Sequence, residues 1–276
     1  IVSGLADMVL INGAERYDSP GQILDWDNSR GEFKHPIFWA SIFTKAYKRK
    51  FSVSEEELAL VSVKNHKHAK ENPNAISNKT FTIQDVMNSK KLTDDLRLLD
   101  CSRPCTGSAS ILLASEEITK KITDMPVWIT GIGQKTTSAG FTKNMSFSSM
   151  ESTKIASNAA LKMANQSIQD IDVAEVHDAF SVCEPMALES LGFSNSGNGT
   201  NLIKELYDTN DFKINPRGGL IGSGHPLGAT GIAQTIEITQ QLQSNADTRQ
   251  VDNANVGLVH NMSAAATSST VLILEK

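Results

Sequence analysis

Short apolar segments alternate with amphipathic stretches along this chain of 276 residues. The apolar segments predict strands at residues 8–12, 111–114, 127–131, 173–177, 256–259 and 271–275. Helical periodicity predicts helices at residues 54–70, 153–167, 181–191 and 232–242. Ser54 is expected to cap the first of these helices, and Gly192 to end the third. Because strands alternate with helices from residue 127 onward, the pattern indicates an α/β fold.

The first predicted strand differs from a half-exposed strand in its pattern. Residues 8–12 are apolar in a continuous run, which is typical of a strand covered on both faces. Residues 18–107, which follow, are more polar and irregular, and they are far too long for a connecting loop. We therefore expect residues 18–107 to form a subdomain with its own structure.

Composition and charge exclude several classes of protein. The chain is 39% hydrophobic, which is enough for a large core, and its net charge of −5 argues against a nucleic-acid binder. A basic run at residues 45–50 is interpreted as a solvated helix face rather than a phosphate contact. No apolar run approaches the roughly 20 residues of a membrane span, and the start lacks a signal-peptide pattern. Three cysteines fit a reducing cytoplasm, so we expect a cytoplasmic protein.

Two histidines are the strongest candidates for chemistry. His225 lies among six glycines in residues 215–231, and glycine lets the backbone pass close to a ligand. His177 ends the predicted strand 173–177, at the edge where α/β sheets generally bind ligands. Either residue could instead be structural, His225 in a tight loop and His177 in the core. Asp178 could orient a neighbouring group or cap the helix expected near Ser181.

Cysteine and histidine also occur close together in the inserted region. Cys101 and Cys105, with His66 and His68, suggest a zinc site. The Cys-x3-Cys spacing is not the usual Cys-x2-Cys, and the chain has no second cysteine pair. We therefore expect no metal.

Three segments resemble the thiolase superfamily, in its sterol-carrier-protein-2 (SCP2) and archaeal branch. Residues 215–231 resemble its Gly-His-Pro signature. Residues 175–180, Glu-Val-His-Asp-Ala-Phe, resemble its His-Asp-Xaa-Phe block, and residues 257–263 its C-terminal block. Residues 62–66 and 94–101 are similar to the middle region of that branch, so the likeness runs along essentially the whole chain in the same order.

The resemblance implies a fold and an activity. The fold has two related halves in a layered α-β-α-β-α arrangement, here the domains 1–122 and 123–276. The inserted region at about 18–107 in the first domain would cover the acyl-CoA site. The activity is that of an acetyl-CoA C-acetyltransferase of lipid metabolism, which interconverts acetoacetyl-CoA plus CoA and two acetyl-CoA by Claisen condensation. No cofactor is implied beyond the CoA thioester substrates. Relatives are homodimers or homotetramers, and some archaeal ones also assemble with a small OB-fold protein and a 3-hydroxy-3-methylglutaryl-CoA (HMG-CoA) synthase.

Roles for single residues also follow from the resemblance. His225 would activate a nucleophilic cysteine and donate into the oxyanion hole of the enolate, with His177 as the second donor. Backbone N–H groups of Ala264 or Ala265 would contribute to a second oxyanion hole.

The acid/base thiol of the family has no direct counterpart here. The branch often has cysteine where this chain has Ala179, and other thiolases have one in the loop around residues 261–265. Cys183 lies one helical turn after Ala179 and could project toward the same pocket, or it could be a buried structural cysteine.

The resemblance further implies that the N-terminal half is incomplete. Three βα units, about 90 residues, would precede residue 1 and carry the nucleophilic cysteine. Without them apolar surface and strand edges would be exposed, so we expect the chain not to fold stably alone. Two other functions stay open: a thiolase-fold retro-aldolase on a CoA thioester, which needs no thiol, and a non-catalytic scaffold or lipid-carrier subunit.

Overall fold

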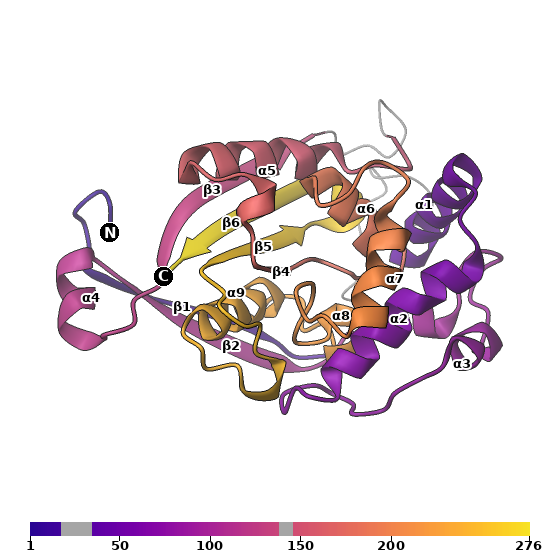
Figure 1. Ribbon diagram of the computed structural model, residues 1–276, viewed down its shortest axis with the longest axis horizontal. Coiled ribbons are helices and arrows are strands. Elements are labelled where there is room, and N and C mark those ends of the chain that lie inside the picture. Colours follow the sequence, from indigo (N-terminus) through magenta and orange to yellow (C-terminus); the bar gives the residue numbers. More distant parts are fainter. Residues whose placement is uncertain (18–34, 138–145) are drawn as a thin grey trace.

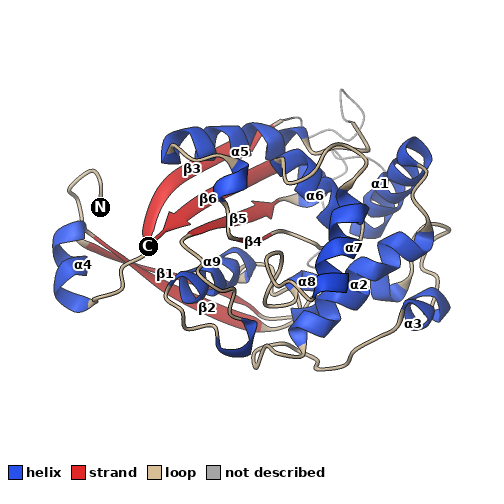
Figure 2. Ribbon diagram, in the orientation of Figure 1, coloured by secondary structure: helices blue, strands red, loops and turns tan. Residues whose placement is uncertain are grey.

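The computed structural model describes residues 1–17, 35–137 and 146–276. Its centre is a mixed four-stranded sheet whose strand order is β3 (Trp128–Thr136), β6 (Ser268–Glu275), β5 (Val256–Met262) and β4 (Val173–Glu175). β4 and β5 are parallel, whereas β6 is antiparallel to both of its neighbours. Figure 2 shows this sheet between two layers of helix.

Small residues set the distances between the layers. Helix α5 (Glu151–Ala164) covers one face of the sheet, and a Cβ atom at Gly133 of β3 would overlap the carbonyl of Ala156 in that helix. Helix α9 (Thr230–Leu242) covers the other face. On its far side lies a two-stranded antiparallel ribbon of β1 (Met8–Glu15) and β2 (Gly107–Ala114). Helix α9 is therefore held between two β layers.

The inserted region between β1 and β2 is mainly helical. It contains α1 (Pro36–Phe51), α2 (Glu55–Ala69), α3 (Ile83–Asn88) and the short turn η2 (Leu98–Asp100). Ser54 caps α2 in a reciprocal capping box with Glu57, which confirms the predicted start of this helix. In the basic run of α1, Lys45, Arg49 and Lys50 are exposed, in agreement with a solvated helix face, and Lys48 lies 3.0 Å from the Glu55 carboxylate.

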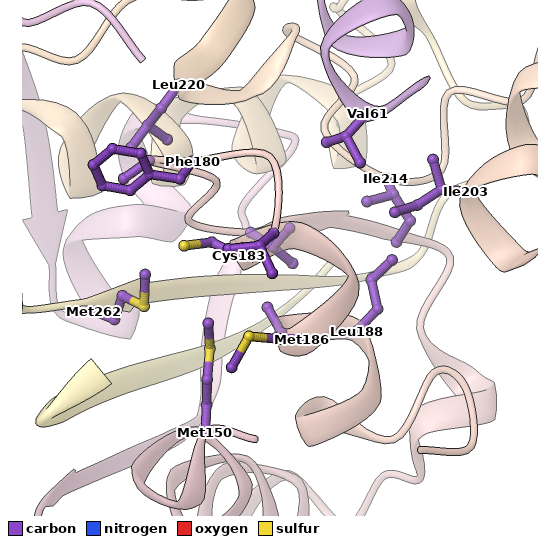
Figure 3. Close-up of a cluster of buried hydrophobic side chains, with 14 of the residues drawn as sticks. Val61, Met150, Phe180, Cys183, Met186, Leu188, Ile203, Ile214, Leu220 and Met262 are labelled. Atoms are coloured by element: carbon purple, nitrogen blue, oxygen red, sulfur yellow. The ribbon is translucent and has the colours of Figure 1, made fainter. Parts of the chain in front are cut away.

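Four further helices complete the described chain: α4 (Glu116–Ile122), α6 (Cys183–Leu191), α7 (Gly199–Thr209) and α8 (Gly219–Ser223). Figure 3 shows the large hydrophobic cluster, in which residues of α6 pack against Met150 and Met262. None of the helices in the described part is long and apolar enough to cross a membrane.

The predicted strands and helices are confirmed, with most strands extending several residues further than their apolar cores. The expectation that residues 8–12 are covered on both faces is wrong. Leu10 is 69% exposed, and its cross-strand partner Leu112 is 48% exposed. The reason is that β1 pairs with β2 alone among the described residues, and only one face of this ribbon lies against α9.

Candidate active site

His177 and His225 line a single cavity of about 870 Å³. Their rings are 5.1 Å apart between centroids and nearly perpendicular, at 86°. His177 follows the end of β4, whereas His225 follows α8 in the glycine-rich loop. Two segments separated by more than forty residues thus present their imidazoles to the same space.

Asp178 ties these two segments together. Its carboxylate accepts hydrogen bonds from the backbone N–H groups of Leu220, at 2.6 Å, and Ile221, at 3.3 Å, at the start of α8. The alternative that Asp178 caps the helix near Ser181 is therefore wrong, because the helix it caps is α8. Gly219 has φ +57°, and a Cβ there would overlap the Asp178 carboxylate, so this position requires glycine.

The chain segment after η2 connects both histidine loops, although nothing in its sequence indicates this. The backbone N–H of Ser102 donates to the carbonyl of Ala179 at 2.9 Å. The backbone N–H of His225 donates to the carbonyl of Arg103, also at 2.9 Å. This segment therefore fixes the distance between the two loops.

Two polar side chains that the sequence did not single out contact the histidine rings, and a third holds one of these two in place. The Thr230 hydroxyl lies 2.8 Å from Nδ1 of His225. The side-chain nitrogen of Asn261 lies 3.1 Å from Nδ1 of His177 and donates to Oε1 of Gln234 at 2.8 Å. Thr230 and Asn261 do belong to the two motifs quoted above. The contact of Thr230 with His225 is local to the glycine-rich loop, whereas that of Asn261 with His177 requires β5 to lie beside β4.

Both cavity histidines are neutral at pH 7. Burial, and next the positive charge of Arg217, lower the pKa of His225 to about 4. Burial also lowers the pKa of His177 well below its usual value, with the neighbouring His225 as the next cause. Arg217 itself is held by Glu175, whose Oε2 lies 3.0 Å from Nε. The rings can therefore accept or donate a proton as neutral imidazoles.

The three cysteines, all within the described residues, are poor nucleophiles as they stand. Cys183 is fully buried in the hydrophobic cluster of Figure 3, and burial raises the pKa of its thiol far above the usual range. The structure thus places Cys183 in the core and not among the residues that line the cavity. Cys101 does line it, but burial raises its pKa to about 12, and its thiol donates to the Arg97 carbonyl at 3.4 Å. Burial also raises the pKa of Cys105.

The C-terminal loop reaches the cavity at its beginning. Asn261, Met262 and Ser263 are lining residues, and Ala264 and Ala265 follow them in the turn η5 (Ala264–Ala266). Ala265 has φ +56°, a left-handed conformation that alanine rarely adopts. The N–H groups expected to form an oxyanion hole are therefore one or two residues beyond the lining side chains.

The candidate zinc ligands have other partners. Nδ1 of His66 bonds to the Ser62 carbonyl at 2.9 Å, and Nδ1 of His68 bonds to the Asn215 carbonyl at 3.0 Å. His68 also stacks on Phe212, with 4.3 Å between ring centroids. In the described part of the chain, no group of three or more His, Cys, Asp or Glu side chains is arranged to hold a metal ion. These contacts explain His68 as part of the packing, whereas His66 also lines the cavity that contains His177 and His225.

A second cavity, of about 380 Å³, lies between the β1–β2 ribbon and the main sheet. Leu227 and Asn261 line both cavities, so the two spaces adjoin. Most of its remaining lining is aliphatic: Ile11, Ile111, Leu113, Ile129, Ile232, Val259 and Leu272.

Comparisons of sequence identify relatives. The family model described as thiolase C-terminal domain-like matches residues 133–276. An acetyl-CoA acetyltransferase of Methanothermobacter thermautotrophicus is 34% identical over 285 aligned residues, which cover 100% of this chain and 74% of that protein. Sterol carrier protein 2 of Gallus gallus is 36% identical over 79% of this chain but only 41% of its own length.

Comparisons of structure also find proteins of similar fold. A protein described as the Ltp2-ChsH2(DUF35) aldolase superposes with a TM-score of 0.86 at 21% identity, over 100% of this chain and 74% of that one. A monomeric SCP2-thiolase-like protein of Mycobacterium smegmatis superposes with a TM-score of 0.73 at 17% identity, over 99% of this chain and 56% of that one. At these identities the likeness concerns the fold.

Proposed function

This chain belongs to the thiolase family and has the thiolase fold, and we propose that it acts in a Claisen condensation and thiolysis of acyl-CoA. The reaction would interconvert acetoacetyl-CoA plus CoA and two acetyl-CoA. The observation that carries the proposal is the pair of neutral histidines, His177 and His225, facing each other in one cavity of about 870 Å³. A cavity of this size accommodates the acyl end of a thioester.

The reaction requires a thiol to hold one acyl group, a base to remove a proton next to a thioester, and donors for the enolate oxygen. The neutral His225 supplies a proton acceptor. His177, 5.1 Å away between centroids, supplies a donor to the developing oxygen charge. Backbone N–H groups of Ala264 or Ala265 would stabilise the tetrahedral intermediate on the acylated thiol.

The acylated thiol itself is expected from outside these 276 residues. Burial keeps the thiols of Cys101 and Cys183 protonated, so neither is activated for attack. The aliphatic cavity between the ribbon and the sheet adjoins the histidines through Leu227 and Asn261. We propose that a further helix lies there and carries the nucleophilic cysteine at its end next to His225.

A retro-aldolase that cleaves a β-hydroxyacyl-CoA is the second candidate. One observation favours it: the cavity holds a proton acceptor and a proton donor but no activated thiol, and an aldol cleavage needs only the first two. The structural neighbour described as an aldolase superposes over the whole chain.

For the assembly, we propose a cytoplasmic homodimer or homotetramer. An OB-fold protein and an HMG-CoA synthase are the further partners expected. The mass of the native particle, measured together with the intact masses of its denatured chains, tests this assembly.

Thiolysis of acetoacetyl-CoA by free CoA tests the function. The protein is assayed with every polypeptide that copurifies with it, and His225→Ala is expected to abolish turnover while His177→Ala strongly reduces it. His68→Asn is the matched control, because His68 is buried as well but contacts Asn215 and Phe212 outside the cavity. Cleavage of a β-hydroxyacyl-CoA without thiolysis would establish the aldolase instead, and neither activity would leave a scaffold or lipid carrier.

A further inference from the structure

We infer that two sets of hydrogen bonds hold the cavity histidines in opposite tautomers, so that His225 presents a bare Nε2 and His177 an Nε2–H. Thr230 sets the first tautomer, and Asn261 with Gln234 sets the second. The catalytic meaning of this arrangement rests on the proposed function. The tautomers themselves are properties of the free protein and can be measured without a substrate.

The tautomer of His225 follows from the single proton of the Thr230 hydroxyl. That oxygen lies 2.9 Å from the Pro226 carbonyl, and two oxygens this close need a proton between them, which only the hydroxyl carries. The hydroxyl oxygen is then an acceptor toward Nδ1 of His225, 2.8 Å away. Because a neutral imidazole has one N–H, the proton lies on Nδ1 and Nε2 is bare.

The tautomer of His177 follows from a longer relay. Gln234 lies 3.3 Å from the His260 carbonyl, which can only accept, so its amide nitrogen faces that carbonyl and its Oε1 faces Asn261. Asn261 must then present its nitrogen to Oε1, at 2.8 Å. The second N–H of the same nitrogen points to Nδ1 of His177, at 3.1 Å. Nδ1 of His177 is therefore an acceptor, and the ring proton lies on Nε2.

His260, beneath His177, agrees with this assignment. Its Nδ1 accepts from the backbone N–H of His177 at 3.5 Å, so its proton lies on Nε2, which donates to Thr153 at 3.1 Å. The hydroxyl of Thr153 then donates to that of Ser269, and Ser269 donates to Ser152. The Ser152 hydroxyl donates to the backbone carbonyl of Ala266, where the series ends. Each donated proton in this series of hydrogen bonds has one acceptor, as expected for a buried polar network.

Tautomers matter here because the rings are neutral. Burial keeps His177, His225 and His260 uncharged at pH 7, so the position of the single ring proton decides which nitrogen donates and which accepts. Arg217 is the charged group whose field reaches both cavity rings, and it opposes protonation of each.

In this arrangement the two rings have different roles in one proton transfer. Nε2 of His225 takes the proton from the carbon next to the thioester and becomes the imidazolium. The C–H electron pair forms the enolate double bond, and the former carbonyl pair moves to the oxygen, which accepts from Nε2–H of His177. Thr230, Asn261 and Gln234 are therefore positioning residues, which act through the histidines.

Nuclear magnetic resonance of protein labelled with nitrogen-15 in histidine tests the inference directly. Long-range proton–nitrogen correlations at pH 7 should show His225 with its proton on Nδ1, and His177 and His260 with theirs on Nε2. Asn261→Asp should move the proton of His177 to Nδ1, because a carboxylate only accepts. The same tautomer in both cavity histidines of the unmodified protein would overturn the inference.

Thr230→Val and Thr230→Ser separate a positioning role from a structural one. The valine variant should lose the fixed tautomer of His225 and slow thiolysis by about 100-fold, with kcat falling more than KM rises, whereas serine should restore both. Thr239→Val is the matched control on the same helix, since its hydroxyl also donates to a carbonyl one turn earlier, that of Thr235. If valine at position 230 left the His225 tautomer unchanged, Thr230 would have no positioning role. Fixed opposite tautomers without thiolysis would instead count against the proposed function alone.

Discussion

Five histidines in the described part of this protein are buried, burial lowers the pKa of each, and each has its own hydrogen-bond partner. In the cavity, burial keeps the rings of His177 and His225 uncharged, as the proposed donor and acceptor roles require. His68, in contrast, is a packing residue between the Asn215 carbonyl and the Phe212 ring. The same desolvation acts on both kinds of residue, so a low histidine pKa alone does not identify the active site.

The pH dependence of stability tests the state of His68. Burial, with Lys64 as the next cause, lowers its pKa to about 3, whereas an unfolded chain has a histidine pKa near 6.5. The unfolded state therefore binds more protons below pH 6.5, and stability due to this group falls as the pH falls from 6.5 toward 3. The drop in free energy of unfolding between pH 7 and pH 5 should be about 2 kcal/mol smaller in His68→Asn than in the unmodified protein.

Urea unfolding at the two pH values measures this difference. The stability lost with the Phe212 contact cancels in the comparison, because it is the same at both pH values. From pH 7 to pH 8 the two proteins should change in parallel, since His68 is neutral in both states there. A drop of equal size in both proteins would show that His68 is protonated in the folded state.

Among single residues, the sequence identified those that belong to a recognisable motif. It missed those whose contacts with the site depend on the fold. His177 and His225 were predictable from the strand end and the glycine loop. Gln234 was not, because it is an ordinary polar residue on α9 until β5 brings Asn261 within 2.8 Å of it. The sequence left two alternatives for Cys183, a position near the cavity or a place in the core. The structure shows the second, because α6 begins at Cys183 and this side chain is fully buried.

Among the elements, the short helix α8 determines where His225 lies. It packs against α2 through Gly222, where a Cβ atom would overlap the Asn65 carbonyl and come within 2.8 Å of the Ala69 Cβ. Both helices would have to separate to admit a side chain. The close contact explains why a helix of five residues can hold a functional loop.

Gly222→Ala is therefore expected to destabilise the protein by about 1–3 kcal/mol, because the extra methyl group overpacks a rigid contact. Gly231→Ala is the matched control on α9, where the nearest atom to a new Cβ lies 3.6 Å away. That variant should gain up to about 1 kcal/mol from helix propensity. Thermal unfolding of the two variants measures both changes, and equal stabilities would contradict the packing of α8 on α2.

Element prediction succeeded where a local signal marks the end of a helix, whereas α1 and α7 were not predicted. The capping box at Ser54 and the C-cap at Gly192 are local signals, and both were correct. The prediction that β1 is covered on both faces was wrong, because an apolar pattern shows only which side chains could be buried. Whether they are buried in the described structure depends on the layers that cover the strand. The role of the segment from Asp100 to Cys105 could not be predicted, since it lies in backbone hydrogen bonds that any side chains could accompany.

At the scale of the whole molecule, the outer face of the β1–β2 ribbon exposes apolar side chains. Leu10 and Leu112 are direct cross-strand partners on that face. Exposed apolar patches on a two-stranded ribbon favour association. We expect the 276-residue chain on its own to self-associate with rising concentration.

Sedimentation velocity over a range of concentrations measures this, and Leu10→Lys should shift the distribution toward the smaller species. Met163→Lys is the matched control, because Met163 is 63% exposed but lies on α5, away from the ribbon. An equal effect of both substitutions would indicate a general change in solubility and not an interface at the ribbon.

The position of the acylated thiol decides whether this sequence contains the nucleophile of the proposed reaction. If the nucleophile lies outside these residues, incubation of the purified protein with acetyl-CoA should leave one acetyl group on a peptide that is not part of this sequence. His225→Ala should abolish this labelling, because a protonated thiol then has no acceptor. Mass spectrometry of the digested protein locates the label. Acetylation of Cys101 would contradict the prediction, since it would mean that substrate binding lowers the pKa of a thiol that burial otherwise raises to about 12. The cavity would then supply its own nucleophile, and the aliphatic space beside it would need another occupant.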